Sequence, residues 1–485
     1  SVAAHDGLGS TLHYHNRRGE ILRAVPAENE DVNETWLTDR DRYSHFGLYA
    51  EDRVREPMVK ENGEWRTVSW EAAIEAAASA LKTAVDEHGA DQLGVLMSPS
   101  ALTEEYFQAQ ALARALGCAN IDHRLRETDF SDDAAQPTTP QLGAKPAEME
   151  QASSILLIAS NIRHEAPILG HRVRKAWRAG AAVSAINPID FDFHFDLAHK
   201  HIAAPQDLVN SVASLTAATA AVTGKQIPET LSGLAGVEPG EGLKAMAAGL
   251  AGDGQSVIVL GQLGMSHPQA SALRQMAHWI AEATGSRLNL LPHGGNPVGA
   301  WRAGAVPHRG AGGSDRDAGM NARQMLEQPR NAYLLWGFEP DFDIANPALA
   351  DKALSSASTV VAVASFATGH LAELADVILP LAAIPESEGS LHRLDGESVL
   401  VRPAGRATGQ CKPGWKILRR LGEALGLEGF DQVSLAELRE VMNEQISGEA
   451  SASTPPSVET VSAEKGLHRI GEVPMYAVDA LCRRS

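Results

Sequence analysis

The sequence has 485 residues, a formal net charge of -19, 44% hydrophobic residues and 21% charged residues. These values are typical of a globular protein with two to four units of ~100–200 residues, and the acidic balance argues against nucleic acid or an anionic membrane as a direct partner. Three widely separated cysteines, Cys118, Cys411 and Cys482, argue against a disulfide framework or a site ligated by cysteines alone. No run approaches the ~18 apolar residues of a membrane helix, and the start at Ser1 without a signal-peptide pattern predicts an internal segment of a longer protein.

Residues 1–55 are predicted to form a small β-rich unit. Apolar and polar side chains alternate crudely over residues 12–15 and again over residues 20–25. Residues 16–19, with the sequence Asn-Arg-Arg-Gly, are typical of a turn between these two runs. The pattern therefore predicts a β-hairpin.

Residues 56–446 are predicted to form an α/β body. Its first helix is expected over about residues 70–88, because Ser69 is a good N-cap and Gly89 is a stop signal. Short apolar runs then alternate with helical patterns, which indicates βαβ units and a doubly wound parallel sheet. The expected strands are 93–97, 155–159, 182–186, 257–260, 288–291, 332–335 and 360–364, and the expected helices are 101–116, 169–179 and 268–284. A low-complexity linker is expected at 447–465, followed by a short tail at 466–485.

Charged residues follow two of the predicted strands. Asp122, Arg124 and Arg126 come after one short apolar run, and Arg163 lies where another strand passes into a helix. Functional groups collect at the carboxyl ends of strands in such sheets, so these residues could bind a phosphate-rich cofactor. Paired Arg and Asp residues more commonly form structural networks. We favour an internal salt-bridge network.

A histidine-rich run occupies residues 190–201 and contains His194, His199 and His201. Imidazole and carboxylate groups suit divalent transition metals, so an autonomous metal-binding module is one interpretation. The strict alternation of Phe and Asp instead predicts an edge strand with one buried face. We favour the strand, because no His-x3-His pair at helical spacing fixes a tetrahedral site. A catalytic Ser-His-Asp set is not identifiable, since a Gly-x-Ser-x-Gly elbow is absent from the sequence.

Several segments, taken in their order along the chain, resemble one family. They are Val32-Asn33-Glu34-Thr35-Trp36, Asn120-Ile121-Asp122-His123-Arg124-Leu125-Arg126, Arg163-His164-Glu165-Ala166-Pro167, Val298-Gly299-Ala300-Trp301 and Val473-Pro474-Met475-Tyr476. Together they resemble the large iron–sulfur subunit of NADH–quinone oxidoreductase (respiratory complex I), whose mitochondrial counterpart is the 75-kilodalton subunit. The resemblance implies a molybdopterin-oxidoreductase-like α/β fold, with doubly wound Rossmann-like lobes in two interleaved parts. The unit at 1–55 would resemble the 4Fe-4S domain of the molybdenum and tungsten enzymes.

In that family, cluster cysteines follow the spacing C-x2-C-x3-C, and a last cysteine stands in Leu-Cys-Asp-Arg-Gly-Arg. Here the corresponding positions hold Ala3, Asp6, Ser10 and Thr38. His5 and Asp6 could substitute for thiolates as ligands of such a cluster. Thiolates are the rule for cubanes, so we favour a hydrogen-bonded loop that keeps the backbone shape of the site. The resemblance therefore implies no cofactor in this segment, and it places the 2Fe-2S and 4Fe-4S clusters in a part of the subunit that lies upstream.

The resemblance implies a scaffold without catalytic residues or metal ligands, in which Asp122, Arg124, Arg126 and Arg163 belong to a vestigial pterin crevice. The whole subunit would carry electrons from NADH, through FMN and iron–sulfur clusters, to quinone, coupled to proton translocation. Expected partners are the flavin/NADH-binding and quinone-module subunits of the peripheral arm, at the cytoplasmic face of the bacterial inner membrane. The alternative is a molybdenum- or tungsten-pterin oxidoreductase of formate dehydrogenase type.

Overall fold

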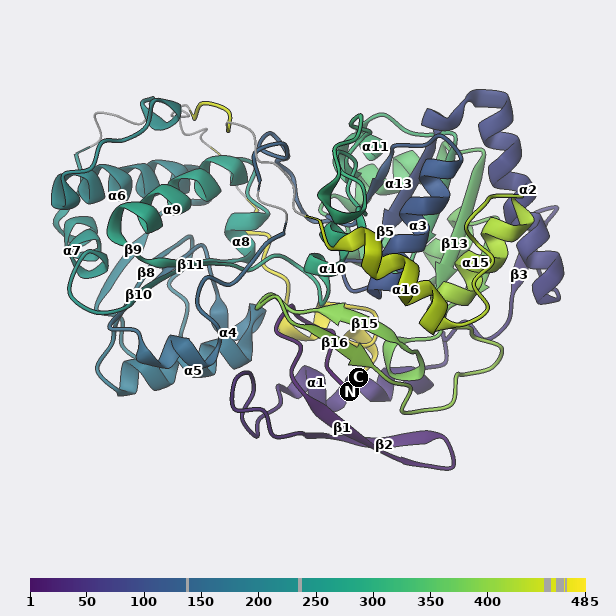
Figure 1. The fold of residues 1–485 in the computed structure, drawn as a ribbon, viewed down its shortest axis with the longest axis horizontal. Coiled ribbons are helices and arrows are strands. Elements are labelled where there is room, and N and C mark those ends of the chain that lie inside the picture. Colours follow the sequence, from purple (N-terminus) through teal and green to yellow (C-terminus); the bar gives the residue numbers. More distant parts are fainter. Residues whose placement is uncertain (137–138, 234–237, 449–454, 459–465, 467–468) are drawn as a thin grey trace.

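A computed structural model describes the chain except for residues 137–138, 234–237, 449–454, 459–465 and 467–468. The linker predicted at 447–465 therefore lies largely outside the described residues. Two mainly parallel sheets, each covered by helices, occupy opposite halves of the molecule in Figure 1. The predicted α/β fold class is confirmed.

The first residues form the predicted hairpin. Strands β1 (Leu12–Arg17) and β2 (Glu20–Pro26) pair in antiparallel register, and Arg18 and Gly19 turn between them with positive φ angles of 57° and 90°. A short helix, α1 (Asp39–Tyr43), and a 3-10 helix, η1 (Ser44–Tyr49), follow. Both the first and the last residues of the chain lie in this region (Figure 1).

The larger half is built on a seven-stranded sheet in the order β4-β3-β14-β13-β12-β5-β6. Strands β5, β6, β12, β13 and β14 are parallel, and β3 and β4 are antiparallel additions. The strands are β3 (Met58–Glu61), β4 (Glu64–Thr67), β5 (Leu93–Met97), β6 (Ile121–Asp122), β12 (Ala332–Trp336), β13 (Thr359–Ala364) and β14 (Val377–Pro380). Its helices are α2 (Trp70–His88), α3 (Thr103–Ala115), α11 (Ala322–Glu327), α12 (Pro340–Asp343), α13 (Pro347–Ser355), α14 (Gly369–Leu374), α15 (Gly414–Ala424) and α16 (Leu435–Ile446).

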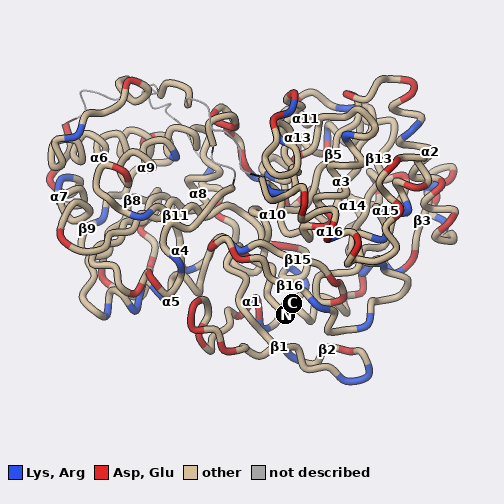
Figure 2. The backbone as a smooth tube through the Cα atoms, viewed as in Figure 1, with Lys and Arg blue, Asp and Glu red and all other residues tan. Residues whose placement is uncertain are grey.

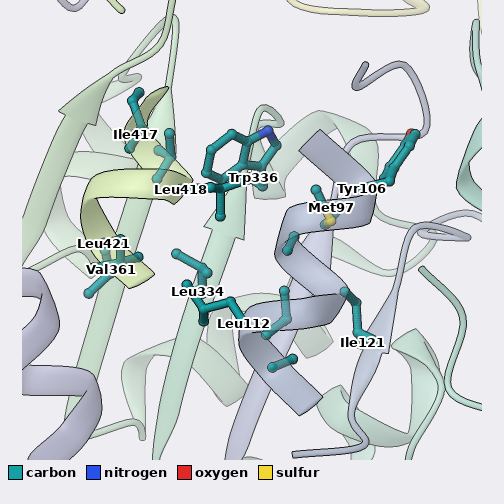
Figure 3. Packing of buried hydrophobic residues seen from close by; sticks show 14 of the residues in the cluster. Met97, Tyr106, Leu112, Ile121, Leu334, Trp336, Val361, Ile417, Leu418 and Leu421 are labelled. Atoms are coloured by element: carbon teal, nitrogen blue, oxygen red, sulfur yellow. The ribbon is translucent and has the colours of Figure 1, made fainter. Parts of the chain in front are cut away.

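Both faces of this sheet are buried, because side chains alternate along each strand. On β12, Leu334 and Trp336 belong to the core under α2, α3, α15 and α16, whereas Leu335 belongs to the core under α11 and α13. Figure 3 shows Trp336 with Leu418 of α15 on one side and Tyr106 of α3 on the other. Helix α2 has the predicted bounds and caps, since the Ser69 hydroxyl accepts from the Ala72 N–H and Gly89 ends the helix.

The smaller half is built on an all-parallel sheet in the order β11-β10-β7-β8-β9. Ile258 and Leu260 of β10 pack under α6, α7 and α9, and Val257 and Val259 pack toward α5. The strands are β7 (Ser154–Ile158), β8 (Ala182–Asn187), β9 (His199–Ile202), β10 (Ser256–Leu260) and β11 (Arg287–Leu290). The helices are α4 (Ile162–Glu165), α5 (Pro167–Arg178), α6 (Leu208–Thr223), α7 (Glu241–Leu250), α8 (Gln262–Met265) and α9 (Ala270–Thr284).

Along the sequence, strands β3 to β6 belong to the larger half and β7 to β11 to the smaller half. From β12 onward the chain is again in the sheet of the larger half. Helix α10 (Pro297–Ala303) and the hairpin of β15 (Gly389–His392) and β16 (Ser398–Val401) lie toward the middle of the molecule (Figure 1). The remaining 3-10 helices are η2 (Ala90–Gln92), η3 (Ala147–Gln151), η4 (Pro205–Asp207), η5 (Glu229–Leu231), η6 (Ala311–Gly313), η7 (Ile384–Glu386), η8 (Met475–Ala477) and η9 (Cys482–Arg484).

The edge strand predicted across residues 190–201 is wrong for most of its length, since only β9 (His199–Ile202) is extended in the sheet. His194 adopts a left-handed φ of 60°, and its N–H donates to the Asp192 carboxylate at 2.9 Å. Phe193 is buried and stacks on Phe195. The alternation of Phe and Asp thus reflects a loop that buries aromatic rings under α5, not a pleated strand.

Charges of both signs are scattered over both halves of the molecule (Figure 2). In the part of the chain that the structure describes, none of the helices combines the length and apolar character needed to cross a bilayer.

Candidate functional site

The predicted crevice centres on a buried ion network at the end of β6. The Arg124 side chain donates to Asp122 at 2.9 and 3.0 Å and to Asp133 at 2.5 and 3.0 Å. The guanidinium carbon lies 4.7 Å from the Phe130 ring centroid and 5.3 Å from that of Trp301. Asp122 is 0% exposed and Arg124 is 4% exposed.

The guanidinium of Arg124 is already paired with carboxylates of the same chain. Burial alone would raise the pKa of Asp122, but the guanidinium of Arg124 holds that pKa below its usual value. All three nitrogens of the Arg124 guanidinium donate to carboxylates. A pyranopterin dinucleotide is polyanionic and requires cations that are free to meet its phosphates. The paired residues at this position do not fit such a group.

The other two predicted crevice residues have other polar partners, although Arg126 lines the same cavity as Arg124. Arg126 donates to the Phe342 carbonyl and lies 3.8 Å from the Asp343 carboxylate. Arg163 lies on α4 in the smaller half, donates to the Asp192 carbonyl at 2.6 Å, and is 40% exposed at its side chain. The structure therefore pairs Asp122 with Arg124 and places Arg126 in the same cavity lining, but it leaves Arg163 in the smaller half.

The segment around Arg163 joins the smaller half to the first residues of the chain. Glu165 is buried, and its carboxylate accepts from the Gln262 N–H at 2.7 Å and from the Ser160 hydroxyl. Arg40 donates to the backbone carbonyls of His164 at 3.1 Å and Glu165 at 3.0 Å. Burial raises the pKa of Glu165 to about 7.

Replacing Glu165 by glutamine is expected to stabilise the protein at pH 8 and to change it little at pH 5. A carboxyl whose folded pKa is raised binds its proton more tightly in the folded state, so its contribution to stability falls as the pH rises from about 4.5 to about 7. The gain at pH 8 should be on the order of 3 kcal/mol. Urea unfolding at both pH values measures it. Glu87→Gln, at an exposed glutamate, is the control, and equal effects of Glu165→Gln at the two pH values would contradict the assignment.

The positions aligned with the family's cluster cysteines have structural roles. The Thr38 hydroxyl accepts from the Asp41 N–H at 3.1 Å and caps α1. Asp6 forms a buried ion pair with Arg40. Ala3 and Ser10 are buried, and the Ala3 N–H donates to the Ser10 carbonyl at 2.9 Å.

A group of possible ligands, of which sequence reasoning had singled out only His5, lies in the same place. His5 Nδ1 is 2.5 Å from Asp479 Oδ2 and 3.3 Å from Cys482 Sγ, and that sulfur is 3.8 Å from the same carboxylate oxygen. Burial alone would lower the pKa of His5, but Cys482 and Asp479 together raise it. No sequence pattern could have indicated this group, because 474 residues separate His5 from Asp479.

The histidines of the predicted metal module do not gather in this way. His194 is 58% exposed at its side chain, and His201 Nε2 lies 3.0 Å from the Ser211 hydroxyl. Among the described residues, the group of three that places its ligand atoms close enough to hold a metal ion is His5, Asp479 and Cys482.

Comparisons with known proteins agree with this fold. The family model for molybdopterin oxidoreductase matches residues 53–424, and the model for the NADH-ubiquinone oxidoreductase NDSU1/NuoG-like 4Fe-4S domain matches residues 1–45. Acetylene hydratase from Pelobacter acetylenicus superposes with a TM-score of 0.69 at 14% identity, covering 89% of this chain and 70% of that one, a likeness of fold alone.

The relatives carry the names of respiratory subunits. The chain is 26% identical to the G subunit of NADH-quinone oxidoreductase from Rickettsia bellii, over 88% of this chain and 55% of that protein. It is 24% identical to the mitochondrial NADH-ubiquinone oxidoreductase 78 kDa subunit of Neurospora crassa, over 95% of this chain and 56% of that protein. The chain thus spans a little over half of the length of these relatives.

The prediction that this segment holds no cofactor is wrong, because the 4Fe-4S domain model matches its residues 1–45. An iron–sulfur domain therefore lies in this segment itself. The four positions at residues 3, 6, 10 and 38 hold no thiol and do not fit a cubane ligated by four cysteines. The prediction considered those positions and His5, whereas the fold also brings Asp479 and Cys482 next to His5 in the same domain.

Proposed function

Since this chain belongs to the molybdopterin oxidoreductase family, we propose that it is the body of the large iron–sulfur subunit of an NADH–quinone oxidoreductase. The whole complex would pass electrons from NADH, through FMN and iron–sulfur clusters, to quinone and couple this transfer to proton translocation. We propose a division into a small unit at 1–55, a body at 56–446 in two interleaved lobes, a linker at 447–465, and a tail at 466–485 that returns to the small unit.

The buried ion network around Arg124 is the main observation in support of a scaffolding role for the body. A pterin enzyme needs free cations in its crevice, and here Arg124 is neutralised by Asp122 and Asp133. The order of the two family models along the chain and the names of the relatives support the respiratory assignment. The body would then hold neighbouring subunits in place around the redox centres.

Native electrophoresis of solubilised membranes from cells that carry a tagged full-length protein tests this proposal. We expect the tag to migrate with the flavin/NADH-binding and quinone-module subunits of the peripheral arm, at the cytoplasmic face of the membrane. The band should also show NADH–quinone activity. Migration apart from those subunits, together with the oxidation of formate or a similar small substrate, would favour the alternative pterin enzyme.

The small unit offers a surface for such a partner. Tyr43, Phe46 and Tyr49 are 45%, 53% and 41% exposed. They recur every three residues along α1 and η1, and a 3-10 helix has three residues per turn, so their side chains share one face. Clustered exposed aromatic side chains are typical of protein interfaces.

Replacing Tyr43 and Phe46 together by alanine is expected to weaken assembly into the complex by about tenfold or more, because buried aromatic anchors contribute more than ~1 kcal/mol each. The stability of the isolated protein should stay within about 0.5 kcal/mol of the original. The fraction of tagged protein in the complex measures the effect. Val433→Ala, at a 73% exposed position before α16, is the matched control. Equal incorporation of both variants would contradict a partner at this face.

A further inference from the structure

The group formed by His5, Asp479 and Cys482 has the donor types and the spacing of a single-metal site. A tetrahedral ion about 2.0–2.1 Å from nitrogen and oxygen and about 2.3 Å from sulfur places N and O about 3.3 Å apart, and sulfur about 3.6 Å from each. The sulfur already lies 3.3 Å from His5 Nδ1 and 3.8 Å from Asp479 Oδ2. The remaining N···O distance of 2.5 Å would widen as a metal ion replaces the hydrogen bond.

Surrounding groups hold two of these ligands in the required orientation. His5 Nε2 lies 2.8 Å from the Ser44 hydroxyl, a contact that leaves Nδ1 free to ligate when Nε2 carries the proton. The other oxygen of Asp479 accepts from the N–H groups of Leu481 at 2.9 Å and Cys482 at 3.0 Å. Such outer partners are typical of metal sites, because they fix the tautomer of the histidine and the rotation of the carboxylate.

A cavity supplies the fourth position. His5 and Asp479 line it together with Tyr14, Glu339 and Phe366. Three protein ligands with one open position are the pattern of zinc sites that keep a bound water. One thiolate, one imidazole and one carboxylate differ from the four thiolates of a cubane and suit one borderline-soft ion.

We propose that His5, Asp479 and Cys482 bind one divalent transition-metal ion of the zinc or ferrous class, which ties the segment at 469–485 to the first residues of the chain. Binding would displace the protons that the free ligands carry and leave them on the solvent. This site uses different residues from the four positions aligned with the family's cluster cysteines.

Titration of the metal-free 485-residue chain with Co²⁺ tests the proposal. We expect one Co²⁺ per chain, intense visible bands of tetrahedral cobalt, and a near-ultraviolet charge-transfer band from the thiolate. Cys482→Ser should remove the charge-transfer band, and His5→Gln should weaken binding further than Ser44→Ala does. Ser44→Ala removes only an outer partner and should weaken binding by about 10–100-fold.

The matched control is Cys411→Ser. Cys411 is also buried, but its thiol donates to the Val54 carbonyl, away from the site. This variant should bind Co²⁺ like the original chain. Circular dichroism checks that each variant folds. If Cys482→Ser does not fold, the loss of Co²⁺ binding in His5→Gln tests the site instead. Bound Zn²⁺ should also slow proteolytic cleavage of residues 469–485, a readout that does not depend on activity.

Two results would overturn the proposal. One is the absence of Co²⁺ binding, or a charge-transfer band that persists in Cys482→Ser and disappears in Cys411→Ser. The other is reconstitution with iron and sulfide that yields four irons and labile sulfide per chain, because that product is a cluster and not a single ion.

Discussion

Replacing Arg124 by methionine is expected to lower the free energy of unfolding by about 3–5 kcal/mol at pH 7, because it leaves two carboxylates without their buried cation. Asp122 is 0% exposed and also accepts the N–H groups of His123 and Ala322. Methionine keeps the stem that packs between Phe130 and Trp301 and loses the charge. Urea unfolding followed by circular dichroism measures the change.

The pH dependence of the unfolding free energy of Arg124→Met distinguishes the effect of the lost charge from the effect of lost packing. Arg124 lowers the pKa of Asp122 in the folded protein. The stabilising contribution of this ion pair is therefore present above the pKa that Asp122 has in the unfolded chain, and it is lost as the pH falls through the pKa of Asp122 in the folded protein. The difference between variant and original should therefore shrink on acidification. Arg163→Met removes an arginine that is 40% exposed and should change stability by less than about 0.5 kcal/mol. Equal effects of Arg124→Met and Arg163→Met would contradict a structural network.

The double substitution Arg483→Met and Arg484→Met is expected to destabilise the protein by about 3–5 kcal/mol. Both arginines donate to Glu339, at 2.7 Å each, and the side chain of Glu339 is only 2% exposed. The guanidinium carbons also lie 5.0 Å from the Phe342 ring centroid and 4.2 Å from that of Phe366. Removing both cations leaves the buried carboxylate of Glu339 unpaired and also takes Arg483 away from the buried Asp343.

Thermal unfolding and limited proteolysis of residues 469–485 measure this effect together. Adding Glu339→Gln to the double variant should recover part of the loss, because the stranded charge is then removed. Arg420→Met, which breaks an exposed pair with Glu423 on α15, should leave both readouts unchanged. A double variant that resists protease like the original would show that these pairs do not hold the segment.

The fold could be predicted to the extent that it depends on local patterns. Helix α2 has the predicted bounds, since Ser69 and Gly89 cap it, and the fully buried apolar runs became parallel strands. The segment at 190–196 could not be assigned correctly, because alternating Phe and Asp residues fit a strand and a loop that buries aromatic rings equally well. Only the structure distinguishes the loop from the strand, because it shows His194 in a left-handed conformation.

The candidate site could be predicted only in part, because its pairs are set by tertiary contacts. Asp122 and Arg124 are two residues apart, and their pairing followed the prediction of a salt-bridge network. Asp133, from a loop, and Trp301, from helix α10, contact the same guanidinium. The group of His5, Asp479 and Cys482 joins residues at the two ends of the sequence, and no spacing rule reaches so far.

The molybdenum, tungsten and pterin content of the protein, purified within its native complex, distinguishes a scaffold from a pterin enzyme. We expect elemental mass spectrometry to find molybdenum and tungsten well below one atom per chain. Oxidised-pterin fluorescence should be equally low, because Arg124 is already neutralised by Asp122 and Asp133. One equivalent of molybdenum or tungsten with pterin would instead show that the body is a pterin enzyme with its active site in the crevice around Asp122.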